Sequence, residues 1–315
     1  MKVPVPRRVL LFGASGTIGQ VVARELVARG HAVTCVLRRG SRAEIPAGGT
    51  VSVVELADGA SLTPQAVGDG SFDVVLSCLA SRSGAPDDAW LVDYAANRAA
   101  LEVAQARGAG QMILLSAICV QRPLLAFQHA KLAFEQELQE SGLNWTIVRP
   151  TAFFKSLSGQ VARVAAGKPF LLFGNGELTR CKPISDADLA RYLADCIDNP
   201  DRHGRILPIG GPGPAISPRE QGEILFELTG QPARYRHVPA GLFSAAAAVL
   251  GAVGKLSRWA AEKAEYARIA GYYATQSMLV LDPATGEYSE NATPETGSET
   301  LRDHYTQILA ELDPR

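Results

Sequence analysis

The first half of this chain alternates two kinds of hydrophobic pattern, and that alternation limits the folds open to it. Short runs rich in Val, Ile and Leu, each long enough for one buried strand, occupy residues 7–16, 31–39, 51–58, 72–80, 111–120 and 144–150. Patterns with helical periodicity separate them and end at glycines, at residues 17–31 and 89–108. Repeated strand–helix–strand units predict a doubly wound α/β fold, a parallel sheet with helices on both faces.

A glycine-rich loop follows the first predicted strand. The segment Gly13-Ala-Ser-Gly-Thr-Ile-Gly19 joins that strand to a helix, which is the context a dinucleotide-binding loop of the Rossmann type requires. Glycines let the backbone turn tightly and approach a pyrophosphate, which the N–H groups of the helix N-terminus then hold. The residues expected to contact the cofactor here are Gly13, Ser15, Gly16, Thr17, Ile18 and Gly19.

The end of the second predicted strand indicates which dinucleotide binds. Arg38 and Arg39 stand where an acidic residue would bind the ribose 2′-hydroxyl of NADH, and the next carboxylate is Glu44. This favours NADPH. Asp58, after the third strand, is either a contact to the adenine amine or a loop cap. At the carboxyl end of the fourth strand, Cys78, Leu79 and Ala80 are expected to border the cofactor, because ligands of such sheets bind at that edge.

Beyond Pro150 the alternation loosens into a second, smaller and mainly helical region. A helix is predicted to begin at Ser185 and Asp186, and another at Ser217 with Pro218 in its first position. We expect residues 1–155 to form the nucleotide domain, with 182–211 returning to it. Residues 156–181 and 212–315 are expected to form a substrate-binding domain.

Composition excludes several classes of protein. Lys plus Arg number 31 against 32 Asp plus Glu, a net charge of -1, which argues against a nucleic-acid partner. Five scattered cysteines without a CxxC pair predict reduced thiols, a cytoplasmic location, and neither a metal nor an iron–sulfur site. The early glycines also interrupt any signal-peptide core. The apolar stretch 241–254 is shorter than the ~18 residues that a membrane span needs. It is a lid, an interfacial helix in peripheral membrane contact, or ordinary packing.

The order of elements resembles the short-chain dehydrogenase/reductase superfamily, in its extended, atypical branch, over residues 7–210. Members usually carry Tyr-x-x-x-Lys on the helix after the fifth strand and a Ser at that strand's end. Here Ser116 ends the strand and Lys131 is kept, and both are expected to take part in catalysis, but Phe127 replaces the tyrosine. That tyrosine would protonate a developing alkoxide, so carbonyl reduction is disfavoured. Hydride transfer to a conjugated carbon–carbon double bond remains open, since the acceptor itself spreads the charge. Lys131 is expected to orient the nicotinamide ribose.

Five further segments together resemble one family, the 3,8-divinyl (proto)chlorophyllide 8-vinyl reductases of chlorophyll and bacteriochlorophyll synthesis. They are GASGTIG (13–19), HAKLAFE (129–135), RPTAFFKSLSGQV (149–161), GNGELTRCKPISDADLA (174–190) and the segment 271–305. The resemblance implies an enzyme that uses NADPH to reduce the 8-vinyl group of divinyl chlorophyllide or protochlorophyllide to ethyl. Pro150, Thr151, Ala152 and Phe153 would line the nicotinamide, and His129, Lys155 and Tyr94 are candidates for the proton donor.

Two other functions remain open at this stage. An isoflavone-reductase-like enzyme or quinone reductase would also keep the lysine and lack the tyrosine, but the segment after Gly271 counts against it. A non-catalytic regulator that binds NADPH would keep the glycine loop, although Ser116 and Lys131 argue mildly against it. The oligomeric state and the preferred tetrapyrrole are not decided by the sequence.

Overall fold

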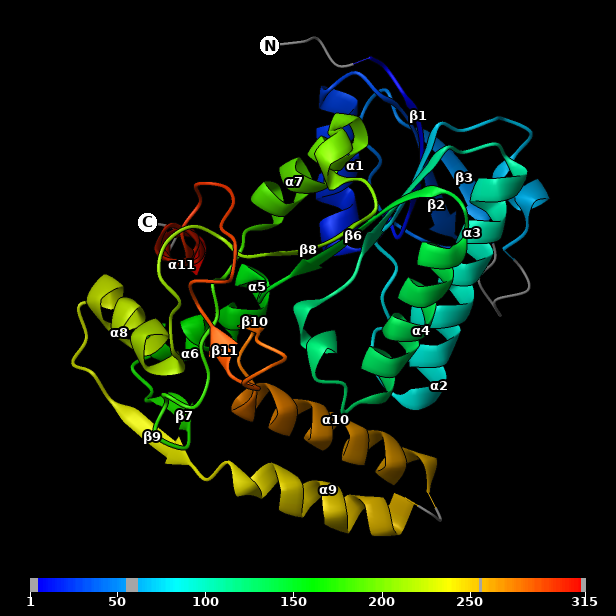
Figure 1. Cartoon of the computed structure of the whole chain (residues 1–315). Coiled ribbons are helices and arrows are strands. Elements are labelled where there is room, and N and C mark those ends of the chain that lie inside the picture. Colours follow the sequence, from blue (N-terminus) through cyan, green and yellow to red (C-terminus); the bar gives the residue numbers. More distant parts are fainter. Residues whose placement is uncertain (1–4, 55–61, 255–256, 313–315) are drawn as a thin grey trace. The chain divides into compact units, whose positions relative to one another are not determined.

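The structure, a computed structural model, describes residues 5–54, 62–254 and 257–312. The chain divides into two compact units (Figure 1). Unit 1 comprises Met1–Arg149 and Leu189–Leu207, and unit 2 comprises Pro150–Asp188 and Pro208–Arg315.

Unit 1 is built on a twisted sheet. Within the described residues the sheet has seven strands in the order β3-β2-β1-β4-β5-β6-β8, and β1 to β6 pair in parallel. The strands are β1 Arg8–Phe12, β2 Ala32–Arg38, β3 Thr50–Val54, β4 Val74–Ser77, β5 Gln111–Leu115, β6 Asn144–Pro150 and β8 Arg205–Ile209. The order reverses between β1 and β4, which is the switch point where ligands of such sheets bind. The predicted fold class is confirmed.

Helices cover both faces of this sheet (Figure 1). They are α1 Thr17–Ala28, α2 Pro86–Ala89, the π-helix η3 Trp90–Ala96, α3 Asn97–Ala106, α4 Ala126–Glu140 and α7 Asp186–Asp198, with short 3-10 turns η2 Pro64–Val67, η4 Ile118–Gln121 and η6 Pro200–Arg202. On one face, Phe134 and Leu138 of α4 pack with Met112 and Ile147 of the sheet in a fully buried cluster. Alternate apolar residues of each strand therefore meet the apolar stripe of a helix.

The predicted strands and helices of unit 1 are present in the described residues, but several of their boundaries differ from the prediction. The helix that carries Lys131 begins at Ala126, because Leu125 is still extended and serves as its N-cap. The fifth strand ends at Leu115, so Ser116 is the residue after the strand. The third strand is described only as Thr50–Val54.

Unit 2 consists mainly of helices with two small sheets. Its elements are α5 Phe154–Leu157, η5 Ser158–Gln160, α6 Val161–Ala165, β7 Phe170–Phe173, α8 Pro218–Thr229, β9 Tyr235–Val238, α9 Gly241–Gly254, α10 Arg258–Thr275, β10 Val280–Leu281, β11 Tyr288–Ser289 and α11 Leu301–Leu312. Ser217 caps α8 as predicted, in a reciprocal capping box with Glu220.

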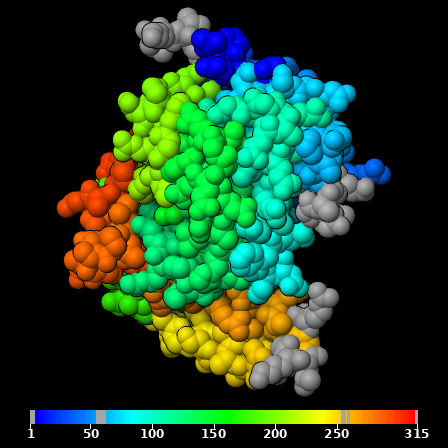
Figure 2. All heavy atoms as spheres, turned by 45° about the vertical axis from the view of Figure 1, so that its right-hand side comes forward, coloured from blue at the N-terminus to red at the C-terminus, as the bar shows by residue number. Residues whose placement is uncertain are grey.

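The long helices α9 and α10 lie side by side, as both views of the molecule show (Figure 2). The predicted helix at 241–254 is therefore confirmed, and one side of it packs on α10. Its other side is open: Leu242 and Val249 are 56% and 67% exposed. In the described ranges no helix combines the length and the apolar character needed to cross a membrane.

Candidate cofactor site and buried polar groups

The glycine loop lies at the switch point because β1 ends beside β4. The Cys78 N–H donates to Phe12 O at 3.0 Å, which places Gly13 against the end of β4. Gly13 has φ +76°, and a Cβ on it would lie 2.6 Å from the carbonyl carbon of Cys78. A Cβ on Gly19 would lie 2.1 Å from the Gly13 oxygen. Both positions require glycine, one for close strand approach and one for close packing of α1.

Gly16 caps α1, and its N–H donates to Gly13 O at 2.9 Å, which closes the turn. Gln20 holds the loop from within the helix, with its Nε2 donating to Ser15 O at 3.2 Å. The first-turn N–H groups of α1 have no acceptor inside the helix, and they carry the positive end of the helix dipole. The loop is therefore shaped to hold an anionic diphosphate.

A cavity of about 510 Å³ lies directly over this loop. Its wall contains most of the residues predicted from the glycine loop and the fourth strand, together with residues of the β4–α2 segment and η3. The predicted residues in that wall are Gly13, Ser15, Gly16, Thr17, Arg38, Cys78, Leu79 and Ala80. Ile18 lies half-buried in the first turn of α1, and Asp58 lies outside the described residues. Burial raises the pKa of the Cys78 thiol to about 12, so this thiol is neutral at physiological pH.

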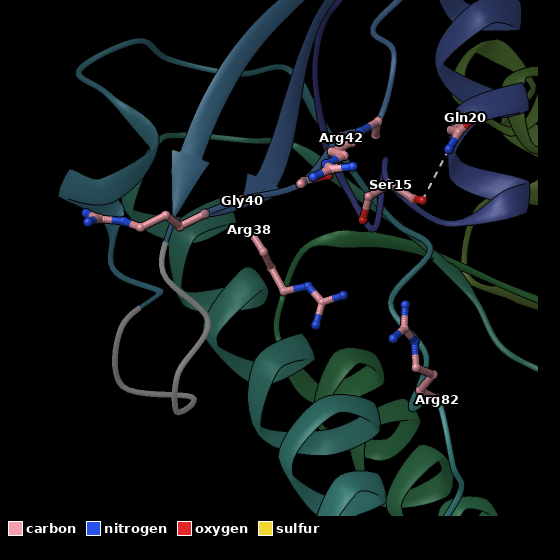
Figure 3. Close-up of a pocket in the computed structure, with 9 residues that line it drawn as sticks. Ser15, Gln20, Arg38, Gly40, Arg42 and Arg82 are labelled. Carbon is pink, nitrogen blue, oxygen red and sulfur yellow. Dashed lines mark hydrogen bonds between the residues drawn. The ribbon is translucent and has the colours of Figure 1, made fainter.

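A second cavity, of about 460 Å³, adjoins Ser15 and is lined by four arginines: Arg38, Arg39, Arg42 and Arg82. Figure 3 shows Arg38, Arg42 and Arg82 around the same space, with the ends of Arg38 and Arg82 on two sides of it. Arg38 and Arg39 are predicted from the sequence, whereas Arg42 and Arg82 are not. Arg82 could not be found from spacing, because it comes from the loop after β4, far along the chain from β2.

Asp88 fixes the loop that carries Arg82. Its Oδ2 accepts hydrogen bonds from the N–H groups of Arg82 and Ser83, at 2.9 and 2.8 Å, and from the Ser83 hydroxyl at 2.7 Å. The pKa of Asp88 is lowered: burial opposes its ionisation, but the Ser83 and Arg82 hydrogen bonds and the charge of Arg38 outweigh that cost. Asp88 is thus an anion that orders the loop by binding its backbone and the Ser83 hydroxyl. The side chain of Arg82 remains in the wall of the cavity.

Lys131 is buried on α4, and its ammonium forms an ion pair with a residue that the sequence analysis does not name. The Nζ atom lies 2.8 Å from Asp93 Oδ1, and the side chain of Asp93 is fully buried. A buried Lys among apolar residues is expected from the helical pattern, but its partner lies on η3, a different element. The pairing of Asp93 with Lys131 is therefore seen only in the three-dimensional structure.

Ser116 is part of a second buried network. Its hydroxyl donates to Glu135 Oε1 at 2.5 Å, and Arg149 forms an ion pair with the same carboxylate. Glu135 is 1% exposed. The Ser116 proton is therefore directed at Glu135. Phe127, at the position of the missing tyrosine, is buried in the same helix.

The other candidate proton donors differ in their surroundings. His129 is exposed on α4. Tyr94 on η3 donates its hydroxyl proton to Glu137, and this hydrogen bond raises the pKa of Tyr94. Lys155, in unit 2, is exposed at the start of α5, where its charge opposes the rise in pKa that burial gives Asp186.

The predicted nicotinamide-lining residues belong to unit 2 or to its boundary. The Thr151 N–H donates to Ile209 O at 2.9 Å, and its hydroxyl donates to Lys182 O. Phe153 forms a parallel bridge with Ile184. Pro150 is the last residue of β6, and Ala152 is half-buried. The segment is thus held by unit 2 backbone, while its role toward a cofactor stays a prediction.

Comparison with known proteins places these features in context. A family model described as NAD(P)H-binding matches residues 13–200. The chloroplastic divinyl chlorophyllide a 8-vinyl-reductase of Cucumis sativus is 45% identical, over 98% of this chain and 78% of that protein. The enzyme of the same name from Oryza sativa subsp. indica is also 45% identical, over 98% of this chain and 80% of its own length. An NADPH-dependent quinone oxidoreductase from Escherichia coli, solved with NADPH, shares the fold with a TM-score of 0.68 at 19% identity, covering 95% of this chain and 99% of that one.

Proposed function

The chain belongs to the divinyl chlorophyllide a 8-vinyl-reductase family, and we propose that it reduces the 8-vinyl group of divinyl chlorophyllide or protochlorophyllide to ethyl. NADPH supplies the hydride when bound. The observation that carries the proposal is similarity at 45% identity, over 98% of this chain, to two reductases of that name, together with a glycine loop and an arginine cavity suited to NADPH. The enzyme is an NADPH-dependent oxidoreductase of chlorophyll biosynthesis.

The residues of unit 1 fit this cofactor. Gly13 and Gly19 let β4 and α1 approach the loop closely, which sets the N-terminus of α1 for a diphosphate. Arg38, Arg42 and Arg82 surround a space suited to the 2′-phosphate, because guanidinium groups bind phosphate bidentately. Lys131, with one of its three N–H donors on Asp93, retains donors for the nicotinamide ribose.

The buried Phe127 fits a vinyl acceptor better than a ketone. Reduction of a ketone leaves an alkoxide that needs a proton donor at once. A vinyl group conjugated to a tetrapyrrole spreads the negative charge over the macrocycle, so less stabilisation by the protein is required. Phe153 is proposed to contact the flat substrate, and His129 or Lys155 to supply the proton.

The direct test is an optical assay. Purified protein with NADPH and divinyl chlorophyllide should shift the Soret band to shorter wavelength as the vinyl group is lost, and divinyl protochlorophyllide run in parallel identifies the preferred substrate. Replacing NADPH by NADH should slow the change. Absence of any shift while NADPH still binds would overturn the proposal. Consumption of NADPH with a quinone but not with either tetrapyrrole would favour the quinone reductase instead.

Cofactor selectivity gives a sharper test of the arginine cavity. Arg82→Gln should raise the Kd for NADPH roughly 10- to 150-fold, since loss of one charge-assisted phosphate contact costs about 1.5–3 kcal/mol, and leave the Kd for NADH unchanged. Arg24→Gln is the matched control, because Arg24 is an exposed arginine on α1 outside both cavity walls. Equal weakening of NADH and NADPH would show that Arg82 supports the loop and not the 2′-phosphate.

We also propose a peripheral membrane contact and a reducing compartment. Helix α9 carries no Asp, Glu, Lys or Arg, and its exposed Leu242 and Val249 could enter a lipid surface. A reducing compartment such as the cytoplasm is proposed from the five scattered cysteines, which form no CxxC pair. The named relatives are chloroplastic. Flotation with vesicles, compared between wild type and Leu242→Ser/Val249→Ser, tests the lipid contact: equal flotation would contradict it.

A further inference from the structure

The pair formed by Asp93 and Lys131 has a feature that stability does not explain. Asp93 Oδ1 is bonded to Lys131 Nζ at 2.8 Å and accepts the Ser81 N–H at 3.2 Å. Its other oxygen, Oδ2, is buried without a hydrogen-bond partner in the described part of the chain. A buried carboxylate with an unsatisfied oxygen is destabilising, and buried ion pairs contribute little net stability. A functional reason for keeping this carboxylate is therefore required.

The backbone around Asp93 is held firmly. The Ser77 hydroxyl, at the end of β4, donates to Asn97 Oδ1 at 2.6 Å. The Asn97 amide in turn donates to the carbonyl oxygens of Val92 and Asp93, at 3.2 and 3.1 Å. Both Ser77 and Asn97 are buried. A continuous set of hydrogen bonds thus connects the strand beside the glycine loop to the residue that holds Lys131.

The local helix geometry at Asp93 is also unusual. Residues Trp90–Ala96 form a π-helix between the α-helical segments α2 and α3. π-helical turns interrupt the regular α-helical hydrogen bonding and are rare, and they occur frequently at functional sites. The π-helix η3 packs against α4, which carries Lys131. The same segment contributes Val92 and Ala96 to the wall of the cavity over the glycine loop.

We propose that Asp93 is a positioning residue for Lys131: it fixes the ammonium at the nicotinamide-ribose end of the cofactor site and so sets the orientation of the ring for hydride transfer. Asp93 acts through Lys131 and does not itself contact the substrate. The ion pair uses one N–H donor of the ammonium and directs the two others to ribose hydroxyls. Phe127, at the position of the missing tyrosine, has no hydroxyl that could form a hydrogen bond with the lysine or the acceptor. The inference rests on the proposed use of NADPH.

The binding test does not depend on turnover. In wild type, titration with NADPH is followed by the fluorescence of the nicotinamide ring, which reports its surroundings. Asp93→Asn should raise the Kd for NADPH about tenfold and reduce the emission of the bound ring. Glu102→Gln is the matched control, because Glu102 is a surface carboxylate on neighbouring α3 that pairs with Arg98. It should stay within twofold of wild type. An unchanged Kd and emission in Asp93→Asn would overturn the proposal.

The kinetic test separates positioning from support of the fold. Asp93→Asn should lower kcat at saturating NADPH at least tenfold, with the KM for the tetrapyrrole within twofold of wild type. Lys131→Met should lower kcat at least as much, and Asp93→Asn/Lys131→Met should be no worse than Lys131→Met alone. Losses that multiply in the double variant would show that Asp93 acts independently of Lys131 and would overturn the proposal.

If Asp93→Asn does not fold, Asn97→Ala takes its place, because it releases the Asp93 backbone without removing either charge. It should also lower kcat while leaving the tetrapyrrole KM unchanged, and normal kcat in it would contradict the inference. The two hypotheses fail differently. Without any Soret shift in wild type the proposed reaction fails, while the fluorescence comparison still decides whether Asp93 orients the nicotinamide.

Discussion

Replacing Gly19 by alanine should separate α1 from the glycine loop and abolish tight binding of NADPH. A Cβ at this position would lie 2.1 Å from the Gly13 oxygen and 2.7 Å from its carbonyl carbon. Ordinary contact begins at 3.4 Å, so helix and loop must move apart by about 1.3 Å. Both obstructing atoms belong to the backbone, and Gly13 is itself fixed against Cys78, so no side-chain rotation can relieve the contact.

The cost follows from this geometry. Overpacking of a buried site costs about 1–3 kcal/mol, and a rigid backbone contact belongs at the upper end of that range. A shift of about 1 Å in a positioning group costs on the order of 100-fold in function, so the Kd for NADPH should rise by a similar factor. Free energies of unfolding come from urea titration followed by tryptophan fluorescence, and Kd from nicotinamide fluorescence.

Two other glycines of unit 1 serve as controls for Gly19→Ala. Gly30 has φ +83° with no atom near its Cβ position, so Gly30→Ala should lose about 1–2 kcal/mol through backbone strain alone and still bind NADPH. Gly110 has neither a positive φ nor a neighbour within 4 Å, and Gly110→Ala should stay within about 0.5 kcal/mol of wild type. A Gly19→Ala variant that binds NADPH within threefold of wild type would refute the reasoning.

Two further predictions concern buried polar groups. Ser116→Ala should lower the free energy of unfolding by about 1 kcal/mol, because Glu135 loses one hydrogen-bond donor but keeps its ion pair with Arg149. The initial rate of vinyl reduction should remain within about tenfold of wild type. A rate more than about 100-fold lower in a fully stable variant would instead indicate that this hydroxyl contacts the substrate. In unit 2, burial lowers the pKa of His304, whose Nε2 lies 3.0 Å from Ser158 Oγ, so the unfolded chain takes up a proton at a higher pH than the folded chain. The free energy of unfolding should therefore be highest above about pH 6.5 and fall as the pH drops below that value. In urea titrations at a series of pH values, His304→Asn should reduce this pH dependence. An unchanged pH dependence would exclude His304 as its source.

The parts of the site that could be predicted from the sequence are those carried by local patterns. The glycine loop can be predicted because its strand, turn and helix are consecutive in the sequence. Arg38 can be predicted because it is the last residue of the next strand. Arg82 and Asp93 are different. Arg82 comes near Arg38 because the parallel crossover brings β4 beside β1, and Asp93 meets Lys131 because η3 packs against α4. In both cases the neighbours are distant in sequence. The hydrophobic periodicity of the sequence does not indicate that the Asp93 carboxylate, on the π-helix η3, faces α4.

The surroundings of Ser116, Lys131 and Phe127 also bear on the protonation step that follows hydride transfer. Ser116 directs its proton to Glu135, Lys131 is held by Asp93, and Phe127 has no proton to give. Two of these polar groups are thus bound to buried carboxylates, which favours support and orientation of the cofactor over proton donation. The carbanion left by hydride transfer is delocalised in the substrate, so its protonation tolerates a donor that is less rigidly placed. The source of the proton should therefore be sought outside these three positions, at His129 or Lys155, which are both exposed, or in water.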